Sequence, residues 1–192
     1  MRVCFGVFLC ALLGLPAGLA QNETFTVNPG QSDVAFSLGD VLHAVHGGFK
    51  VASGSVQFDP QSPQMSGSIV VTTATGESGN SSRDKRMRAV VLESPKFPEA
   101  TFSPKRSNGA IAATGDSTVT VDGVFTLHGQ PHDITVPMQI HIAGNTCTAK
   151  THFAIPYVQW GLKDPSNFLF RVGKEVDMDV TLVGSLSSGA AQ

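Results

Sequence analysis

Residues 133–142 read DITVPMQIHI, and apolar and polar side chains alternate along them without a break. The apolar residues share one face of an extended chain: Ile134, Val136, Met138, Ile140 and Ile142. This period of two predicts a β-strand with one buried face. Pro137 has no backbone N–H to donate, so we expect an edge, a bulge or a local gap in the strand pairing there.

The residues before this stretch repeat its rhythm. Between Ser117 and His128 the alternating apolar positions are Val119, Val121, Phe125 and Leu127. The segment Gly129-Gln130-Pro131 then supplies residues that favour a chain reversal. Two alternating runs separated by such a segment predict a β-hairpin.

The same alternation recurs along most of the chain and predicts roughly eight to ten strands. The other runs are Phe25/Val27, Val34/Phe36/Leu38, Val56/Phe58, Ile69/Val71, Phe153/Ile155/Tyr157 and Val176/Met178/Val180/Leu182. A helix is predicted at Ser81–Leu92, with Asn80, Ser81 or Ser82 as its cap. A short helical turn is also expected at His43–His46.

Antiparallel strands with one short helix form either a sandwich or a closed barrel. Each predicted strand with its connection takes roughly 21 residues, more than the ~8–12 typical of small sandwiches. We therefore predict an all-β fold, an extended eight-stranded antiparallel β-barrel with one short helix. A barrel of this size holds packed side chains or one small ligand.

Residues 1–20, MRVCFGVFLCALLGLPAGLA, carry one cation, an apolar stretch, a proline and small residues at the end. This pattern is typical of a secretory signal peptide. We expect residues 21–192 to form one exported domain, periplasmic or secreted, without stable membrane insertion. Removal of Cys4 and Cys10 leaves Cys147 alone, so no internal disulfide is expected.

The amino-acid composition and the motifs absent from the sequence argue against several classes of function. The chain has 13 lysines and arginines and 15 acidic residues, and it has no long basic run. This composition argues against nucleic-acid binding. The chain has 12 Phe but only 1 Tyr and 1 Trp. Because Phe has no polar group, these side chains are expected in water-free contacts, either in a core or around an apolar cavity. No Gly-x-Ser-x-Gly elbow or phosphate-binding glycine loop occurs, so we expect no enzyme and no cofactor.

Two polar patterns have competing interpretations. The six histidines raise the hypothesis of a metal-dependent enzyme, but their spacing matches no zinc motif and we expect no metal site. Residues 83–88 combine Arg83, Lys85, Arg86 and Arg88 with Asp84. They form either a solvated helical face with local ion pairs or a charged mouth. Such a mouth would bind an anionic headgroup while an apolar tail enters the sheet interior.

An ordered series of short motifs resembles the YceI-like family, lipocalin-like exported proteins that bind polyisoprenoids. It spans nearly all of the chain after residue 20. The motifs are Ser32-x-Val34-x-Phe36, His43 or His46 before Gly54–Asp59, Gly79-Asn80 with Arg83-Asp84 and Met87-Arg88, Phe97–Ser103, Val119-x-Val121 with Phe125–Gly129, Trp160-Gly161 and Val172–Val176.

The resemblance implies a barrel whose lumen holds an isoprenoid chain, such as a quinone or its precursor, for transport, storage or sequestration. It leaves the oligomeric state open, a homodimer included. The expected lipid-binding residues are Phe36, Phe58, Phe102, Phe125, Met138, Ile140, Phe153 and Trp160. The expected headgroup or mouth residues are His46, Arg83, Asp84, Arg86 and Arg88. The alternative is a stress-related interaction protein whose barrel is filled by its own side chains.

Overall fold

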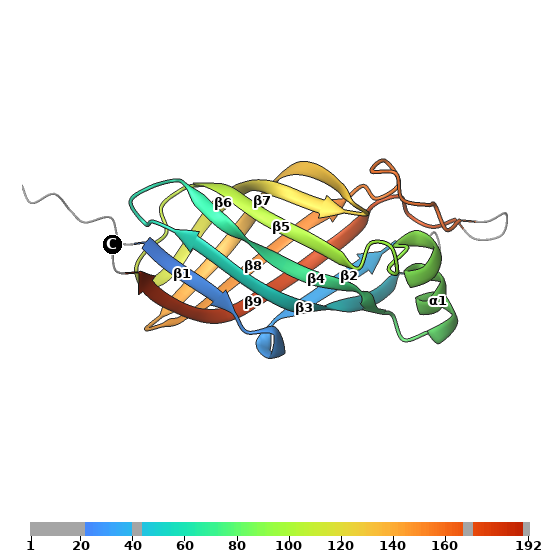
Figure 1. Ribbon diagram of the computed structural model, residues 1–192, viewed down its shortest axis with the longest axis horizontal. Coiled ribbons are helices and arrows are strands. Elements are labelled where there is room, and N and C mark those ends of the chain that lie inside the picture. Colours follow the sequence, from blue (N-terminus) through green and yellow to red (C-terminus); the bar gives the residue numbers. More distant parts are fainter. Residues whose placement is uncertain (1–21, 40–43, 167–170, 190–192) are drawn as a thin grey trace, which may run out of the picture.

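The structure is a computed structural model, and it describes residues 22–39, 44–166 and 171–189. Long strands run along the long axis of the molecule, with α1 at one end (Figure 1). In chain order the elements are β1 (Asn22–Val27), the 3-10 turn η1 (Pro29–Gln31), β2 (Asp33–Leu38), β3 (Val45–Phe58), β4 (Met65–Glu77), α1 (Ser81–Arg86), the π-helical turn η2 (Met87–Val91), β5 (Glu99–Asn108), β6 (Gly115–Leu127), β7 (Gln130–Ala143), β8 (Thr146–Ile155) and β9 (Val176–Gly189).

The sheet closes on itself as an antiparallel barrel. Strands β3 to β9 pair with their neighbours in sequence order, and β1 and β2 both pair with β3 on one side and β9 on the other. β1 and β2 lie end to end because Pro29 begins the turn η1 between them. The nine strands therefore occupy eight positions, and the predicted eight-stranded barrel is confirmed.

The strongest strand signals form the predicted hairpin. β6 and β7 pair continuously from Gly115 opposite Ile142 to Leu127 opposite Gln130. The chain reverses at His128 and Gly129, whose φ angles of 53° and 73° fit a two-residue type I′ turn. The reversal therefore begins earlier than Gly129-Gln130-Pro131. The pairing of β7 with β8 ends at Met138, beside Pro137, so the local gap predicted there is confirmed.

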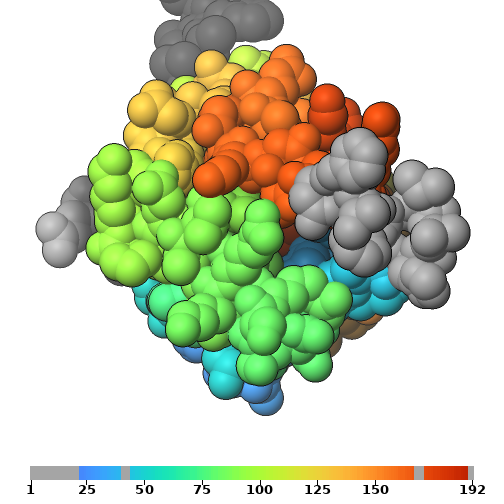
Figure 2. All heavy atoms as spheres, turned by 90° about the vertical axis from the view of Figure 1, so that its right-hand side faces the viewer, coloured from blue at the N-terminus to red at the C-terminus, as the bar shows by residue number. Residues whose placement is uncertain are grey.

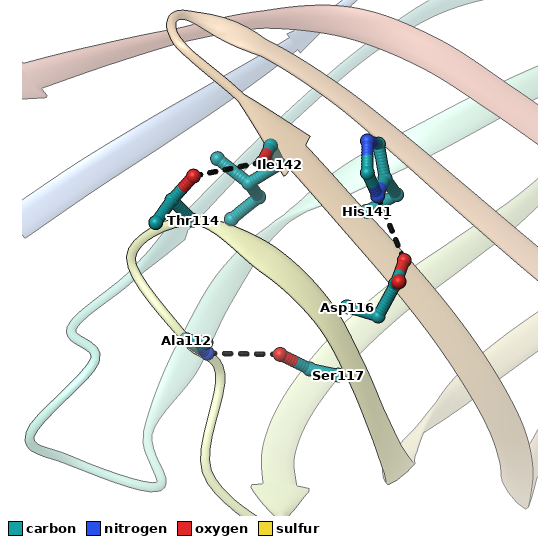
Figure 3. Close-up of polar contacts among 6 residues, drawn as sticks. All are labelled: Ala112, Thr114, Asp116, Ser117, His141 and Ile142. Carbon is teal, nitrogen blue, oxygen red and sulfur yellow. Dashed lines mark hydrogen bonds and ion pairs between the residues drawn. The ribbon is translucent and has the colours of Figure 1, made fainter.

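The half of the barrel far from α1 is packed with its own side chains. Val119, Val121, Ile140, Ile142 and Cys147 are buried there, together with Phe25, Val56 and Phe58. The loop between β5 and β6 adds buried Ile111. Figure 3 shows how this loop is held: the Ala112 N–H donates to Ser117 Oγ (2.9 Å) and the Thr114 hydroxyl donates to the Ile142 carbonyl (3.3 Å). This end of the barrel is closed.

Burial raises the pKa of the Cys147 thiol from its ordinary 9.0 to about 11, because the thiolate loses its hydration. The folded protein at pH 8 should then hold about 100-fold less thiolate than the unfolded chain. We expect Cys147 to react slowly with a disulfide reagent in native buffer and rapidly in urea. Comparable rates in the two conditions would contradict the packed end.

The helical segment confirms the expectation for Ser81–Leu92, but it changes from α1 to the π turn η2 at Met87. Asn80 is the cap, since its Oδ1 accepts from the Arg83 N–H at 3.0 Å. The short helix expected at His43–His46 is wrong at Val45 and His46, which begin β3. His43 and the expected signal peptide lie outside the described residues. None of the described helices has the length and hydropathy needed to cross a membrane.

Candidate functional site: a cavity beneath the helical segment

The half of the lumen nearest α1 contains a cavity of about 580 Å³. A volume of this size is typical of small-molecule binding pockets. Inward-facing apolar residues of the strands form its wall, among them Val34, Phe36, Phe49, Phe102, Phe125, Val136, Met138, Phe153, Met178, Val180 and Leu182. The alternation of each strand explains this wall, because every second side chain points into the barrel.

Two glycines keep the lumen open beside large rings. Gly47 lies opposite Phe36 in the β2–β3 pairing, and a Cβ on Gly47 would collide with the Phe36 ring. A Cβ on Gly123 would lie 2.7 Å from the ring of Phe102. Each phenylalanine ring therefore covers a glycine backbone and lies along the wall. This arrangement lines the cavity with aromatic surface without filling it.

The mouth of the cavity is covered by α1 and η2, which follow the end of β4. Met87, Val91 and Leu92 face the cavity from this segment, beside Ser82, Arg83 and Arg86. The π turn brings Met87 and Val91, four residues apart, to the same side. Turns of this kind are frequent at functional sites.

A hydrogen-bond network fixes α1 to the end of β4. Arg83 donates from Nε to Ser78 Oγ and from Nη2 to the Ser78 carbonyl, both at 2.7 Å. The Ser78 hydroxyl in turn donates to Asp84 Oδ1, and Asp84 is buried. Arg88 donates to the Gly76 carbonyl at 3.0 Å. These groups are committed to holding the helical segment in place.

Arg86 differs from its neighbours. Its side chain lines the mouth of the cavity and is exposed, and it has no hydrogen-bond or ion-pair partner among the described residues. A guanidinium presents several donors in a planar fork that matches a phosphate or carboxylate. Of the two cations in the described cavity lining, Arg83 and Arg86, Arg86 is thus the one available to an anionic group.

A second segment, residues 156–165, covers the mouth beside the helix. Tyr157, Leu162 and Pro165 line the cavity from it. The Tyr157 hydroxyl donates to the Gly173 carbonyl at 2.6 Å. Burial first, and then the nearby Asp164 carboxylate, raises the pKa of Tyr157 to about 12, so this hydroxyl keeps its proton at neutral pH. The contact ties this segment to the residues that lead into β9.

Sequence comparison matches residues 25–184 to the YceI-like domain family. A UPF0312 protein of Pseudomonas syringae pv. tomato is 33% identical over 187 residues, which cover 91% of each chain. A UPF0312 protein of Pseudomonas putida strain W619 is 34% identical over 93 residues, which span 47% of this chain and less than half (46%) of that relative. This chain belongs to the YceI-like domain family.

Solved structures of YceI-like and related proteins share the fold. BcnA of Burkholderia cenocepacia superimposes with a TM-score of 0.70 at 22% identity, over 82% of this chain and 99% of BcnA. A polyisoprenoid binding domain from Saccharophagus degradans superimposes with a TM-score of 0.67 at 16% identity, over 86% and 98% of the two chains. The two likenesses establish the barrel architecture of this YceI-like protein.

The structure separates the expected lipid-binding residues into three groups. Those that line the cavity are Phe36, Phe102, Phe125, Met138 and Phe153. Phe58 and Ile140 face the same lumen but lie buried in its packed half, away from the cavity. Trp160 stacks on His132, with ring centroids 3.9 Å apart, and lies 5.9 Å from the ring of Phe125. It supports the wall from outside the described lining.

The expected mouth residues also lie in different places: some line the cavity, some anchor the helical segment, and one lies on the outer face. Arg83 and Arg86 line the cavity, whereas Asp84 and Arg88 serve the network that anchors the helical segment. His46 lies on the outer face of β3, where its Nδ1 is 2.9 Å from Ser37 Oγ. The alternation decides this, because Val45 beside it points into the cavity.

The described histidines are dispersed. His128 Nε2 lies 2.6 Å from Glu93 Oε2, His141 pairs with Asp116 on the outer face of the barrel (Figure 3), and His152 pairs with Asp179. Among residues 22–39, 44–166 and 171–189, no group of three or more His, Cys, Asp or Glu side chains could hold a metal ion. The histidine pairs instead connect neighbouring strands and loops.

Sequence reasoning missed several residues of the wall. Met178, Val180 and Leu182 belong to an alternating run, and that pattern was sufficient to include them. Tyr157 likewise ends the predicted run Phe153/Ile155/Tyr157. Phe49 lies within β3, where Gly47 and Gly48 interrupt the apolar alternation, and Leu162 lies in the segment after β8. The position of Leu162 in the wall depends on how the chain crosses the mouth.

Proposed function

We propose that this YceI-like protein is a binding protein rather than an enzyme, and that its cavity holds the apolar chain of a polyisoprenoid or similar lipid. One observation carries the proposal: a closed wall of Phe, Met, Val and Leu side chains surrounds about 580 Å³, while its cations, Arg83 and Arg86, lie at the mouth. Such a cavity suits an amphiphile with its tail inside and its polar end beside Arg86. The polyisoprenoid binding domain of Saccharophagus degradans has a similar barrel and supports this ligand class.

The apolar wall provides enough free energy for binding. Each methylene group moved from water into the cavity contributes about 0.8 kcal/mol, so a five-carbon isoprene unit contributes roughly 3–4 kcal/mol before losses. A few units remain favourable after the entropy cost of association is subtracted. A quinone or its precursor is a ligand of this kind, and we propose its transport, storage or sequestration in a periplasmic or secreted setting.

Protein purified after export and without detergent tests the proposal. We expect native mass spectrometry to show the protein with one bound lipid, and organic extraction to release a prenyl-chain compound. The mass of the protein itself would show whether residues 1–20 have been removed. Saturated fatty acids alone would contradict the polyisoprenoid assignment. Absence of any extractable lipid would favour an interaction protein over a carrier.

A substitution at the mouth tests the placement of the polar end. Arg86→Gln should weaken the binding of a prenyl phosphate about tenfold or more, because a hydrogen bond between charged groups is lost. Binding of the corresponding neutral prenyl alcohol should be unchanged. Lys85→Gln is the matched control, since it removes one charge from the same helix without altering the described lining. Equal losses for both ligands would refute a headgroup contact at Arg86.

A further inference from the structure

The charges of this protein are distributed unevenly along the barrel. Eight of its 13 lysines and arginines lie in two segments, residues 83–96 and 163–174, which contain three of its 15 acidic residues. Both segments contribute residues to the mouth of the cavity. Figure 2 looks onto this end, where the green helical segment and the orange segment after β8 lie side by side. These two segments are therefore basic, although exposed Glu77 and Glu175 lie directly beside them.

The three acidic residues do not neutralise these cations. Asp84 accepts from Ser78, Glu93 contacts His128, and Asp164 accepts from the Ser166 N–H. None of the eight cations forms an ion pair with a carboxylate among the described residues. Five of them project from the segments as exposed side chains without a described hydrogen bond: Lys85, Arg86, Lys96, Lys163 and Lys174. The expectation of local ion pairs along residues 83–88 does not hold for the described residues.

An apolar side chain accompanies this charge. Val90 is 36% exposed and is the one large hydrophobic side chain that is exposed in the described part of the chain. It belongs to the π turn η2, where its neighbour Val91 lines the cavity. The turn thus presents Val90 to the exterior and Val91 to the cavity.

We propose that the basic end, formed by α1, η2 and residues 163–166 and 171–174, docks onto the surface of an anionic lipid bilayer with the cavity mouth facing the membrane. Lysine and arginine side chains are attracted to anionic headgroups within about a Debye length of the surface. An exposed apolar side chain among such cations enters the boundary between headgroups and acyl chains. Docking in this orientation would let a lipid pass between bilayer and cavity without crossing water. The docking stands on charge and exposure, and only this transfer role rests on the proposed function.

Vesicle co-sedimentation tests the docking. The protein used is exported, its N-terminus is determined, and any bound lipid is first extracted. We expect binding to vesicles of equal parts phosphatidylcholine and phosphatidylglycerol, weakening with salt, and little binding to phosphatidylcholine alone. Lys85→Gln/Lys96→Gln should weaken binding about 30-fold, since each cation contributes severalfold. Lys105→Gln/Lys150→Gln, which removes equal charge from the barrel wall, should retain most of the binding.

Equal weakening by the two double variants, or absence of vesicle binding, would overturn the proposal; the latter would point to an acidic protein as partner. A polarity-sensitive fluorescent label on an introduced cysteine can locate the contact. The native Cys147 is buried and reacts poorly, so the label attaches mainly at the introduced site. Val90→Cys carrying the label should shift to an apolar emission on anionic vesicles, whereas labelled Thr118→Cys on the outer wall should not. Equal shifts would overturn the assigned orientation. If the protein binds vesicles but never co-purifies with lipid, the docking proposal is supported and the proposed lipid ligand is refuted.

Discussion

Replacing Phe125 with Asp is expected to reduce the affinity for an apolar ligand about 1000-fold, because several kcal/mol are lost when a carboxylate is buried without a partner. Phe125 lines the cavity from β6, and its ring lies 6.1 Å from that of Phe153. In the unliganded protein the new carboxylate can remain hydrated within the cavity. A bound apolar chain would displace that water, so the cost falls mainly on the complex.

Titration with an apolar naphthylamine fluorophore and extraction of co-purified lipid measure this effect. Phe125→Leu should lose less than about tenfold, since it preserves an apolar wall. Thr120→Asp is the control for added charge, because Thr120 is exposed on the same strand. Circular dichroism should show the same sheet in all three variants. Unchanged lipid content in a folded Phe125→Asp protein would remove this cavity as the ligand site.

Ile140→Ala and Met138→Ala should differ in their effects on stability and on binding, although the two residues are neighbours on the same face of β7. Ile140 is buried in the packed half, 7% exposed, so Ile140→Ala should lower the free energy of unfolding by about 2–5 kcal/mol. Met138 is only partly buried and borders the cavity, so part of its side chain faces open space. We expect Met138→Ala to cost less than about 2 kcal/mol.

Urea unfolding and ligand titration together separate these effects. Met138→Ala enlarges the cavity and should change the affinity and the preferred length of the ligand. Ile140→Ala should leave both unchanged while shifting the unfolding midpoint. Equal destabilisation by the two substitutions, with equal effects on binding, would show that the lumen is not divided into a packed half and an open half.

Alternation in the sequence was sufficient to identify most strands and the side of each strand that is buried. Every second residue of β7 from Ile134 to Ile142 faces inward, as the sequence pattern predicts. The cap at Asn80 and the gap beside Pro137 were also predictable, because both depend on local backbone donors. These features require only the chemistry of residues close together in the chain.

Depth within the barrel was decided by the tertiary structure alone. A period of two distinguishes inside from outside, yet it carries no information about position along the barrel axis, which depends on the stagger between paired strands. Met138 therefore borders the cavity while Ile140 and Phe58 fill the opposite end. Likewise, the cations of residues 83–88 are evident in the sequence. The tertiary structure alone shows that Arg88 donates to the Gly76 carbonyl and that Arg86 lines the mouth. Both positions depend on how the helical segment packs against the barrel.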